Sequence, residues 1–461
     1  MSKGPKRAAA APGLPRPAAP ATMRRDPPAA AAARGAHVQE SQTAMTETQA
    51  AASGYAHLFA KGTPPGAPRF TGFPKYNFVG GHNDPTRIPV AALAEAARAV
   101  IEREGANLAL YNLGHGPLGH RGLREVVVEK LRRHRGIATT AEEVLITSGS
   151  LQGLDLVNQL LLEPGDTVLM EELTYGGSIS RVRRMGVNVV PVALDREGMR
   201  MDALSGALDA LKTKGVRPKY IYTIPTIQNP TGSILPADRR ERMLALARAH
   251  GVPVFEDECY ADLIWAGSGK APPALYAMDP AQVIHIGSFS KTLAPALRMA
   301  YACAPWPVLS RLVALKTDAG SGAVEQMLVA EYFGRHFDSH VAALSGVLED
   351  KLRTMVEAVE REFGAAAELF IPKGGIFLWL RLPAEVDVRT LVAPAAARGI
   401  QFNPGPEWAI EPEAARSQLR LCFALPSKEE IREGVAAFAR VCFEQTGIPA
   451  QSGNVRHAAS Q

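Results

Sequence analysis

The sequence predicts an α/β protein in which a large domain, built on a mostly parallel seven-stranded sheet, is followed by a smaller α+β C-terminal domain. Three observations support this prediction. Seven short apolar runs, many separated by helical patterns, begin near residue 144, and a strand–strand–helix order replaces that pattern after Gly364. The 461 residues are enough for two or three domains with a sizeable core.

The seven runs are nearly all apolar, as expected of strands that are buried on both faces of a parallel sheet. They cover residues 144–147, 166–171, 187–194, 218–225, 252–258, 282–290 and 299–305. The clearest helical pattern covers 237–250, where Pro236 precedes the start, Arg and Glu form an outer face, and Gly251 stands at the end.

The smaller domain is predicted from GGIFLWLRLP and SQLRLCFA, which have the character of strands, and from PSKEEIREGVAAFARVCFE. This last segment is a helix pattern that opens with the capping box Ser427-x-x-Glu430. Residues 306–362 are mainly helical in pattern. The expected division is a disordered tail (1–44), an N-terminal arm with part of the small domain (45–95), the large domain (96–325), the small domain (326–448) and a flexible tail (449–461).

The net charge of +5 comes from the first 44 residues, which hold seven Lys or Arg and two acids. The rest of the chain is neutral overall, which argues against a nucleic-acid-binding body. The first segment is rich in Ala and Pro and has few large apolar residues, so we expect it to be disordered. Its composition fits an organellar transit peptide or a dispensable tail with Met45 as the true start, and its many prolines favour the tail.

The four cysteines, Cys259, Cys303, Cys422 and Cys442, form no Cys-x-x-Cys pair. This pattern fits a reducing cytoplasm and no structural zinc. No run reaches the ~18 apolar residues that a membrane span needs.

Functional groups of a doubly wound sheet lie beyond the carboxyl ends of its strands. The first run is followed by Thr147-Ser148-Gly149-Ser150 and a helix, and a helix N-terminus with nearby hydroxyls can bind an anion. The same residues suit a simple N-cap at Ser148 or Ser150, so both interpretations stay open.

Two further strand ends carry candidate groups: Tyr175, before two glycines, follows the run 166–171, and Asn229, within Asn-Pro-Thr-Gly, follows the run 218–225. Tyr175 could stack on a flat cofactor or be a half-buried turn residue. Asn229 could donate its amide to a ligand oxygen or serve a turn.

Two charged residues follow the later strands. Asp257 ends a buried strand, where a carboxylate is costly unless local N–H groups or a cation such as a protonated ring nitrogen compensate it. Lys291 follows another strand, within GSFSKTLAPALRMAY. A partly buried lysine has a lowered pKa and can act as an amine nucleophile, whereas a lysine that reaches solvent has no such role.

Taken in order, these groups resemble the class I/II aminotransferases of the fold-type-I pyridoxal phosphate (PLP) enzymes. The resemblance rests on three motifs and covers about residues 70–445. The motifs are Asn-Pro-Thr-Gly at 229–232, Asp257-x-x-Tyr260, and Ser288-x-Ser-Lys291 with Arg298 seven residues on. The aminoadipate and kynurenine aminotransferases and the enzyme-like domain of MocR-type regulators are the most similar groups.

The resemblance implies that Lys291 forms the internal aldimine with PLP and moves the proton at the substrate Cα. It implies that Asp257 pairs with the ring nitrogen, that Asn229 and Tyr260 bind the ring 3′-oxygen, and that Tyr175 stacks on the ring. It also implies that Ser150, Ser288 and Arg298 bind the phosphate of PLP, and that Leu151, next to Ser150, contacts the cofactor.

For the substrate, the resemblance implies that Arg420 binds the α-carboxylate and that Gly81 and Asn229 face the substrate. Tyr111 would reach the phosphate of a neighbouring subunit, which implies a homodimer with shared active sites. No metal is implied.

The chain departs from the family pattern in three places. Leu151 replaces a frequent glutamine, and Cys259 replaces a frequent proline. His82-Asn83-Asp84 follows Gly81 where relatives have x-Pro-x-Pro, so the side-chain specificity does not carry over.

We therefore expect a cytoplasmic PLP-dependent aminotransferase that acts on an amino acid and a 2-oxo acid. The motifs do not decide which Cα bond breaks, so a β-lyase, decarboxylase, racemase or oxidase on the same fold is an alternative. A MocR-like regulator is less favoured, because residues 1–70 show no helix-turn-helix pattern.

Overall fold

The computed structural model describes residues 54, 56–60 and 63–449. The described residues up to Pro68 and those from Arg69 on fall into two units, and the first contains a short 3₁₀ turn at Ala56–Leu58. The predicted tail 1–44 and residues 450–461 of the predicted tail 449–461 lie outside the described residues. No helix within the described ranges is both long and apolar enough to cross a membrane.

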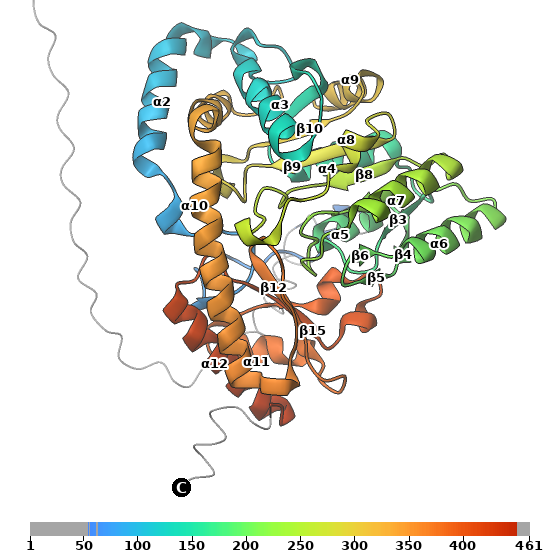
Figure 1. The fold of residues 1–461 in the computed structure, drawn as a ribbon, viewed down its shortest axis with the longest axis vertical. Coiled ribbons are helices and arrows are strands. Elements are labelled where there is room, and N and C mark those ends of the chain that lie inside the picture. Colours follow the sequence, from blue (N-terminus) through green and yellow to red (C-terminus); the bar gives the residue numbers. More distant parts are fainter. Residues whose placement is uncertain (1–53, 55, 61–62, 450–461) are drawn as a thin grey trace, which may run out of the picture. The chain divides into compact units, whose positions relative to one another are not determined.

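The second unit is built around a seven-stranded sheet with the order β2–β10–β9–β8–β7–β3–β4 (Figure 1). Strand β10 runs antiparallel to both of its neighbours, and every other neighbouring pair is parallel. The strands are β2 (Val144–Thr147), β3 (Thr167–Glu171), β4 (Asn188–Val192), β7 (Ile221–Thr223), β8 (Val254–Asp257), β9 (Val283–Ser288) and β10 (Ala300–Cys303). Each predicted run contains one of them, so the predicted fold class is confirmed.

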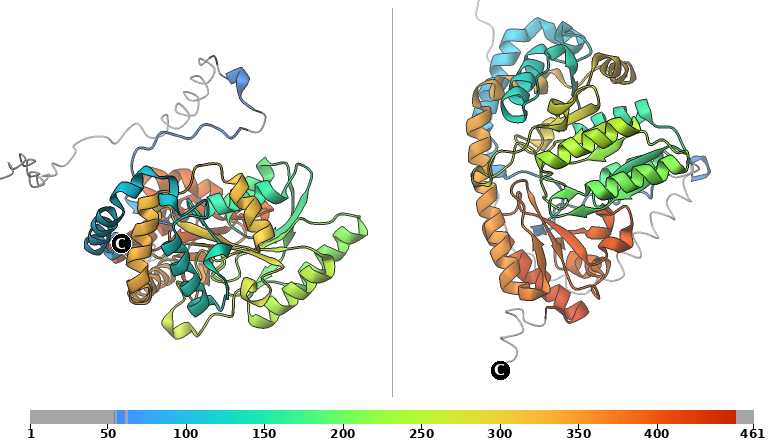
Figure 2. Two further views of the ribbon diagram at one scale, coloured as in Figure 1. Left: turned by 90° about the horizontal axis from the view of Figure 1, so that it is seen from above. Right: turned by 45° about the vertical axis from the view of Figure 1, so that its right-hand side comes forward.

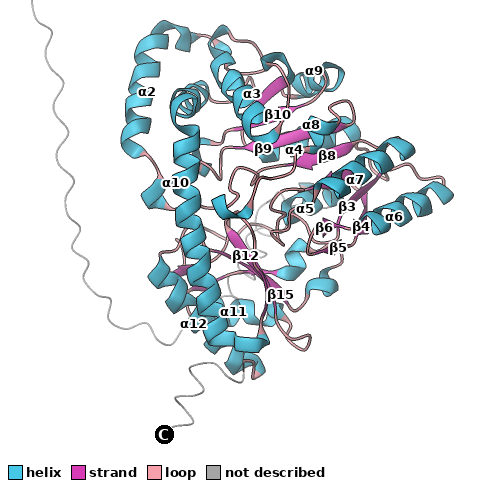
Figure 3. Ribbon diagram, viewed as in Figure 1, coloured by secondary structure: helices cyan, strands magenta, loops and turns pink. Residues whose placement is uncertain are grey.

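Both faces of this sheet are buried along six of its strands, as the apolar runs predict, whereas the edge strand β4 is largely exposed or half-buried. Along β8, Val254 belongs to one apolar cluster and Phe255 to another, since successive side chains of a strand point to opposite faces. The helices of this unit (Figure 3) are α2 (Val90–Glu104), α3 (Arg121–Arg135), α4 (Ser150–Leu161), α5 (Gly176–Arg184), α6 (Met201–Thr213), α7 (Ala237–His250), α8 (Leu275–Met278), α9 (Trp306–Leu315), α10 (Ala323–Phe363), α11 (Val392–Ala397) and α12 (Lys428–Thr446).

A smaller antiparallel sheet follows, with the order β11–β12–β15–β14. Its strands are β11 (Glu368–Phe370), β12 (Phe377–Arg381), β14 (Asn403–Pro404) and β15 (Gln418–Cys422). The short strands β1 (Tyr76–Asn77) and β13 (Ile400–Gln401) pair in parallel, which brings the segment around residue 80 to this part of the chain. A third small ribbon joins β5 (Leu194–Asp195) and β6 (Gly198–Met199).

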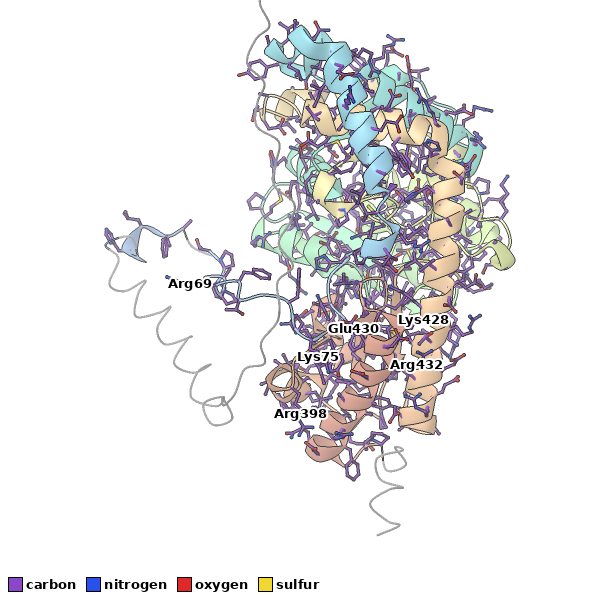
Figure 4. All side chains as sticks on the ribbon, turned by 90° about the vertical axis from the view of Figure 1, so that its left-hand side faces the viewer. Arg69, Lys75, Arg398, Lys428, Glu430 and Arg432 are labelled. Carbon is purple, nitrogen blue, oxygen red and sulfur yellow. The ribbon has the colours of Figure 1, made fainter. Side chains whose placement is uncertain are left out.

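Helix α10 runs past both sheets (Figure 2) and packs on α2, α3 and α12. Helix α12 begins with the predicted capping box: the Ser427 side chain accepts from the Glu430 N–H, and the Glu430 side chain accepts from the Ser427 N–H at 2.7 Å. Glu430 lies near this exposed end of α12, where Figure 4 labels it. The predicted division at residues 95, 325 and 448 stays a prediction.

Candidate active site

Lys291 follows the end of β9, and its Nζ donates to the carbonyl oxygen of Gly81 at 2.9 Å. A side chain at position 81 would collide with this amine, so the glycine is what allows the close approach. Burial lowers the pKa of Lys291. The structure thus brings together two predicted residues, 210 positions apart in the chain, around a lysine that loses its proton more readily than an exposed one.

The N-terminus of α4 lies against Arg298. Gly149 is the N-cap of α4 at φ +86°, and a Cβ at that position would collide with the Arg298 guanidinium. The helix start has no side-chain cap, so the proposed N-cap role of Ser148 or Ser150 is wrong for this structure. Free N–H groups beside a guanidinium favour the anion-binding interpretation.

Side chains around Lys291 complete this candidate anion site at the start of α4. Nη1 of Arg298 donates to Ser290 Oγ at 3.4 Å and to the Pro295 carbonyl at 3.1 Å. Ser288 Oγ accepts from the Ser290 N–H at 3.1 Å. Both serines are buried, so Ser290, which the sequence analysis left without a role, belongs to the same cluster.

Asp257, at the end of β8, is only 5% exposed. Its Oδ2 accepts from the Tyr222 hydroxyl at 2.8 Å, and its Oδ1 accepts from the Cys259 N–H at 3.1 Å. The proline that relatives often have at position 259 could not make this second bond, because it has no N–H. Burial raises the pKa of Asp257, while the hydrogen bonds from Cys259 and Tyr222 act against it.

No ion pair among the described residues includes Asp257. A buried carboxylate that has only neutral hydrogen-bond donors can still be stabilised by a cation. This is the environment that a protonated ring nitrogen would complete.

Arg420 joins the small sheet to the large one. From β15, its Nη1 donates to Asn229 Oδ1 at 2.8 Å, and its Nη2 donates to Asn403 Oδ1 at 2.8 Å. The Asn229 amide lies 3.4 Å from the Tyr260 hydroxyl. The guanidinium also stacks on the Trp408 ring, 3.8 Å from its centroid. The Nε of Arg420 is buried and has no hydrogen-bond partner among the described residues, which leaves a donor available to a carboxylate.

The three remaining predicted cofactor-binding residues, Tyr175, Leu151 and Tyr111, lie in three different environments. Tyr175 immediately precedes α5 and packs beside Trp408, with the ring centroids 5.9 Å apart. Leu151, in the first turn of α4, packs on an apolar cluster. Tyr111 is 83% exposed, and its side chain has no hydrogen bond or ring contact with any described residue, so a single chain does not bring it to the site.

The sequence analysis missed Tyr222, Trp408 and Asn403. Tyr222 looks like an ordinary apolar residue of a buried strand, and only the pairing of β7 with β8 shows that its hydroxyl reaches Asp257. Trp408 and Asn403 lie in a segment with no recognised motif. The available signal was their proximity in sequence to Arg420, which is weak.

The model of the family Aminotransferase class I and II matches residues 79–438. The chain belongs to this family. It is 34% identical to the 2-aminoadipate transaminase of Thermus thermophilus over 369 residues, which are 79% of this chain and 89% of the relative. It is also 32% identical to an uncharacterized HTH-type transcriptional regulator of Bacillus subtilis, over 69% of this chain and 65% of the regulator.

Among solved structures, the α-aminoadipate aminotransferase of Thermus thermophilus superposes with a TM-score of 0.73 at 32% identity, covering 81% of this chain and 93% of the other. That structure holds N-(5′-phosphopyridoxyl)-L-leucine. Our chain is accordingly a PLP-dependent aminotransferase.

The residues of this aminotransferase fit the cofactor. The partly buried Lys291 could hold its aldehyde carbon, the uncapped start of α4 with Arg298 suits a phosphate, and Asp257 suits a ring cation. The three groups come from strand ends of one sheet, as the family's fold requires.

Proposed function

We propose that this aminotransferase moves an amino group from an amino acid to a 2-oxo acid with Lys291 as the residue that holds PLP. The observation that carries the proposal is the partly buried amine of Lys291, which donates to the Gly81 carbonyl and whose pKa is lowered by desolvation. When bound, PLP supplies an electron sink for the bonds at the substrate Cα. Lys291 Nζ would then take the proton from the substrate Cα and deliver it to the cofactor carbon that carried the aldehyde, because a neutral amine is a competent base.

The cofactor would be held on three sides. Asp257 compensates the ring nitrogen, and Asn229 and Tyr260 donate to the ring 3′-oxygen. Tyr175 packs on the ring face. The phosphate binds at Arg298, Ser288 and the N–H groups around Ser150 and Leu151, where the dipole of α4 and the guanidinium both favour an anion.

Arg420 would bind the α-carboxylate of the substrate. Asn229 and Asn403 accept from its two terminal nitrogens and Trp408 covers its face, so the guanidinium is held in one orientation before substrate arrives. Its Nε, which no described residue engages, supports this role. Gly81 leaves room for the substrate next to Lys291.

The functional unit is proposed to be a homodimer. Tyr111 lies in an exposed apolar group with Leu108 and Leu110, which are 44% and 55% exposed. Such a group favours an interface with a second copy, and Tyr111 would then contribute to the partner's phosphate site. All four cysteines are free and buried, which supports a reducing compartment such as the cytoplasm.

The test measures the first half of the reaction. Purified protein loaded with PLP is mixed with single amino acids from a panel, and the 2-oxo acid released is measured against the protein concentration. We expect one equivalent of 2-oxo acid per site from at least one amino acid. Carbon dioxide, ammonia or a racemised amino acid in its place would contradict transamination.

Lys291→Ala is expected to abolish this release, whereas Lys212→Ala, at an exposed position on α6, is expected to leave it unchanged. Borohydride treatment of the loaded protein should attach the cofactor mass to the peptide that contains Lys291. Turnover by Lys291→Ala at the wild-type rate would refute the assignment.

A further inference from the structure

The phenol of Tyr222 is a buried group to which the proposed mechanism gives no role. Its side chain is 1% exposed, and its hydroxyl lies 2.8 Å from Asp257 Oδ2. Among the described residues, two residues donate hydrogen bonds to the Asp257 carboxylate: Tyr222 through its hydroxyl, and Cys259 through its N–H and its thiol. One of the two residues therefore lies on the neighbouring strand.

The direction of the Tyr222 hydrogen bond is set by a third residue. Ser178 Oγ donates to the Tyr222 hydroxyl at 3.1 Å. A phenol has one hydrogen to donate, so when its oxygen accepts from Ser178, its hydrogen is free for the carboxylate. The result is a relay in which Ser178 donates to Tyr222 and Tyr222 donates to Asp257.

Packing holds the relay in place. Tyr222 is paired with Phe255 across β7 and β8, and the two rings meet edge to face with centroids 5.6 Å apart. Asp257 lies two residues beyond Phe255 on β8, and therefore on the same face. Ser178 lies in the first turn of α5, shortly after Tyr175, so the relay also connects the proposed ring-stacking residue with the carboxylate.

We propose that Tyr222 is a positioning residue for the cofactor, which orients the Asp257 carboxylate and keeps it charged for the ring nitrogen of PLP. This inference rests on the role proposed above for Asp257. Tyr222 would thus act on the cofactor through the side chain of Asp257.

The groups that face Asp257 come from four elements. They are Tyr222 on β7, Cys259 after β8, Tyr175 before α5 and His285 on β9. His285 is the one that can become a cation, but its Nδ1 already pairs with Glu256 Oε2 at 2.8 Å. Without the Tyr222 hydroxyl, Oδ2 of a carboxylate that burial already disfavours would lose its donor, which favours the protonated acid.

The experiment compares Tyr222→Phe with Tyr220→Phe. Tyr220 precedes Tyr222 by two residues, is 2% exposed, packs on the same Phe255 ring at 5.7 Å, and donates to Asn158 Oδ1 at 2.9 Å. Each substitution therefore removes one buried hydroxyl and the hydrogen bond that it donates, 2.8 Å long for Tyr222 and 2.9 Å for Tyr220, and only the bond from Tyr222 ends on Asp257. Tyr222→Phe also removes the acceptor of the Ser178 hydroxyl. The dissociation constant for PLP is measured by reconstituting each apoprotein, and thermal unfolding is recorded in parallel.

We expect Tyr222→Phe to weaken PLP binding by roughly tenfold or more, because a hydrogen bond to a charged group is lost. Both variants should lower the melting temperature, because each loses a buried hydroxyl. Tyr220→Phe should leave the dissociation constant for PLP unchanged. Equal dissociation constants for the two variants would overturn the proposal.

The pH dependence gives a second, independent measure. With the phenol gone, the pKa of Asp257 rises further, so the carboxylate is protonated at higher pH and PLP binding weakens as pH falls. The affinity of Tyr222→Phe should approach that of the wild type as pH is raised from 6 to about 9. A pH profile parallel to that of Tyr220→Phe would refute the electrostatic role.

Asp257→Asn separates this inference from the proposal on which it rests. If Asp257→Asn weakens PLP binding and Tyr222→Phe adds nothing in that background, both hold. If Asp257→Asn binds PLP as the wild type does, the role of Asp257 is wrong. If Asp257→Asn weakens binding and Tyr222→Phe alone has no effect, only the role of Tyr222 is wrong.

Discussion

Asp257 and Glu258 are adjacent, both are at least 95% buried, and they face opposite sides of the same sheet. Asp257 receives hydrogen bonds from Tyr222 and Cys259, and burial raises its pKa. Glu258 receives two bonds from Arg135, at 2.5 and 2.6 Å. Burial by itself would raise the pKa of Glu258, but Arg135 outweighs it and lowers the pKa to about 2.

The difference shows how burial alone can be misleading. The charge of Glu258 is compensated within the chain, by an arginine of α3, so it belongs to the stability of the fold. The charge of Asp257 has only neutral partners among the described residues, and in the proposal above its compensating cation is the ring nitrogen of the cofactor. Burial alone therefore does not identify a ligand site, and the partners of each buried carboxylate have to be compared.

Removing the charge of Asp257 should lower activity and leave the stability of the apoprotein almost unchanged. Asp257→Asn removes the charge that the ring nitrogen would meet, and we expect the rate of amino transfer to fall by roughly 10²- to 10³-fold. The unfolding free energy of the apoprotein should stay within about 1 kcal/mol of the wild type, because no ion pair is lost. Single-turnover kinetics and urea unfolding measure the two quantities, and a large loss of apoprotein stability would contradict the comparison.

Breaking the ion pair between Glu258 and Arg135 should lower stability and leave activity almost unchanged. Arg135→Met leaves Glu258 buried without its main cation, and we expect a loss of about 3–5 kcal/mol in unfolding free energy, with the rate per folded molecule retained. Arg132→Met, on the same helix, breaks an ion pair with Glu129 in which both side chains are more than half exposed. That control should cost under about 1 kcal/mol. Equal losses for the two variants would show that the buried pair has no special role.

The pH dependence of stability should sharpen the comparison between paired and unpaired carboxylates. Glu258 has a folded pKa of about 2, below its ordinary 4.5, so its contribution is complete above pH 4.5 and is lost as pH falls towards 2. Glu171, at the end of β3, has only neutral partners, and burial raises its pKa to about 7. The folded state therefore keeps a proton there that the unfolded state loses, and stability falls as pH rises from 4.5 to 7.

Each of these two effects should amount to on the order of 3 kcal/mol across its pH range. Glu171→Gln is expected to flatten the stability profile between pH 4.5 and 7, and Glu258→Gln to flatten it below 4.5. Urea unfolding at a series of pH values tests both. A Glu171→Gln profile with the wild-type slope would contradict the assignment.

Much of the fold followed from local patterns. The seven strands of the large sheet and helix α7 lie where apolar runs and the Pro236 and Gly251 boundaries place them, because a strand buried on both faces has to be apolar along its length. The capping box of α12 was equally readable, since both of its hydrogen bonds join residues three positions apart.

The candidate site was less predictable. The roles of Lys291, Asp257 and Arg420 came from a family resemblance and stay proposals, whereas their contacts depend on packing between distant segments. The uncapped start of α4 shows this: Ser148 and Ser150 suit a cap by composition, but the helix begins without one and faces Arg298. A serine near a helix start does not reveal whether its hydroxyl turns inwards.

By itself, the sequence determined the α/β class, the family and the strand ends that carry polar groups, because these depend on local periodicity and short motifs. The tertiary structure decided which partner each buried charge has. Tyr222 lies 35 residues from Asp257, Arg135 lies 123 residues from Glu258, and Arg420 lies 191 residues from Asn229. Ion pairs and hydrogen bonds act over a few ångströms, so only the order of the strands and the packing of the helices bring such residues within reach.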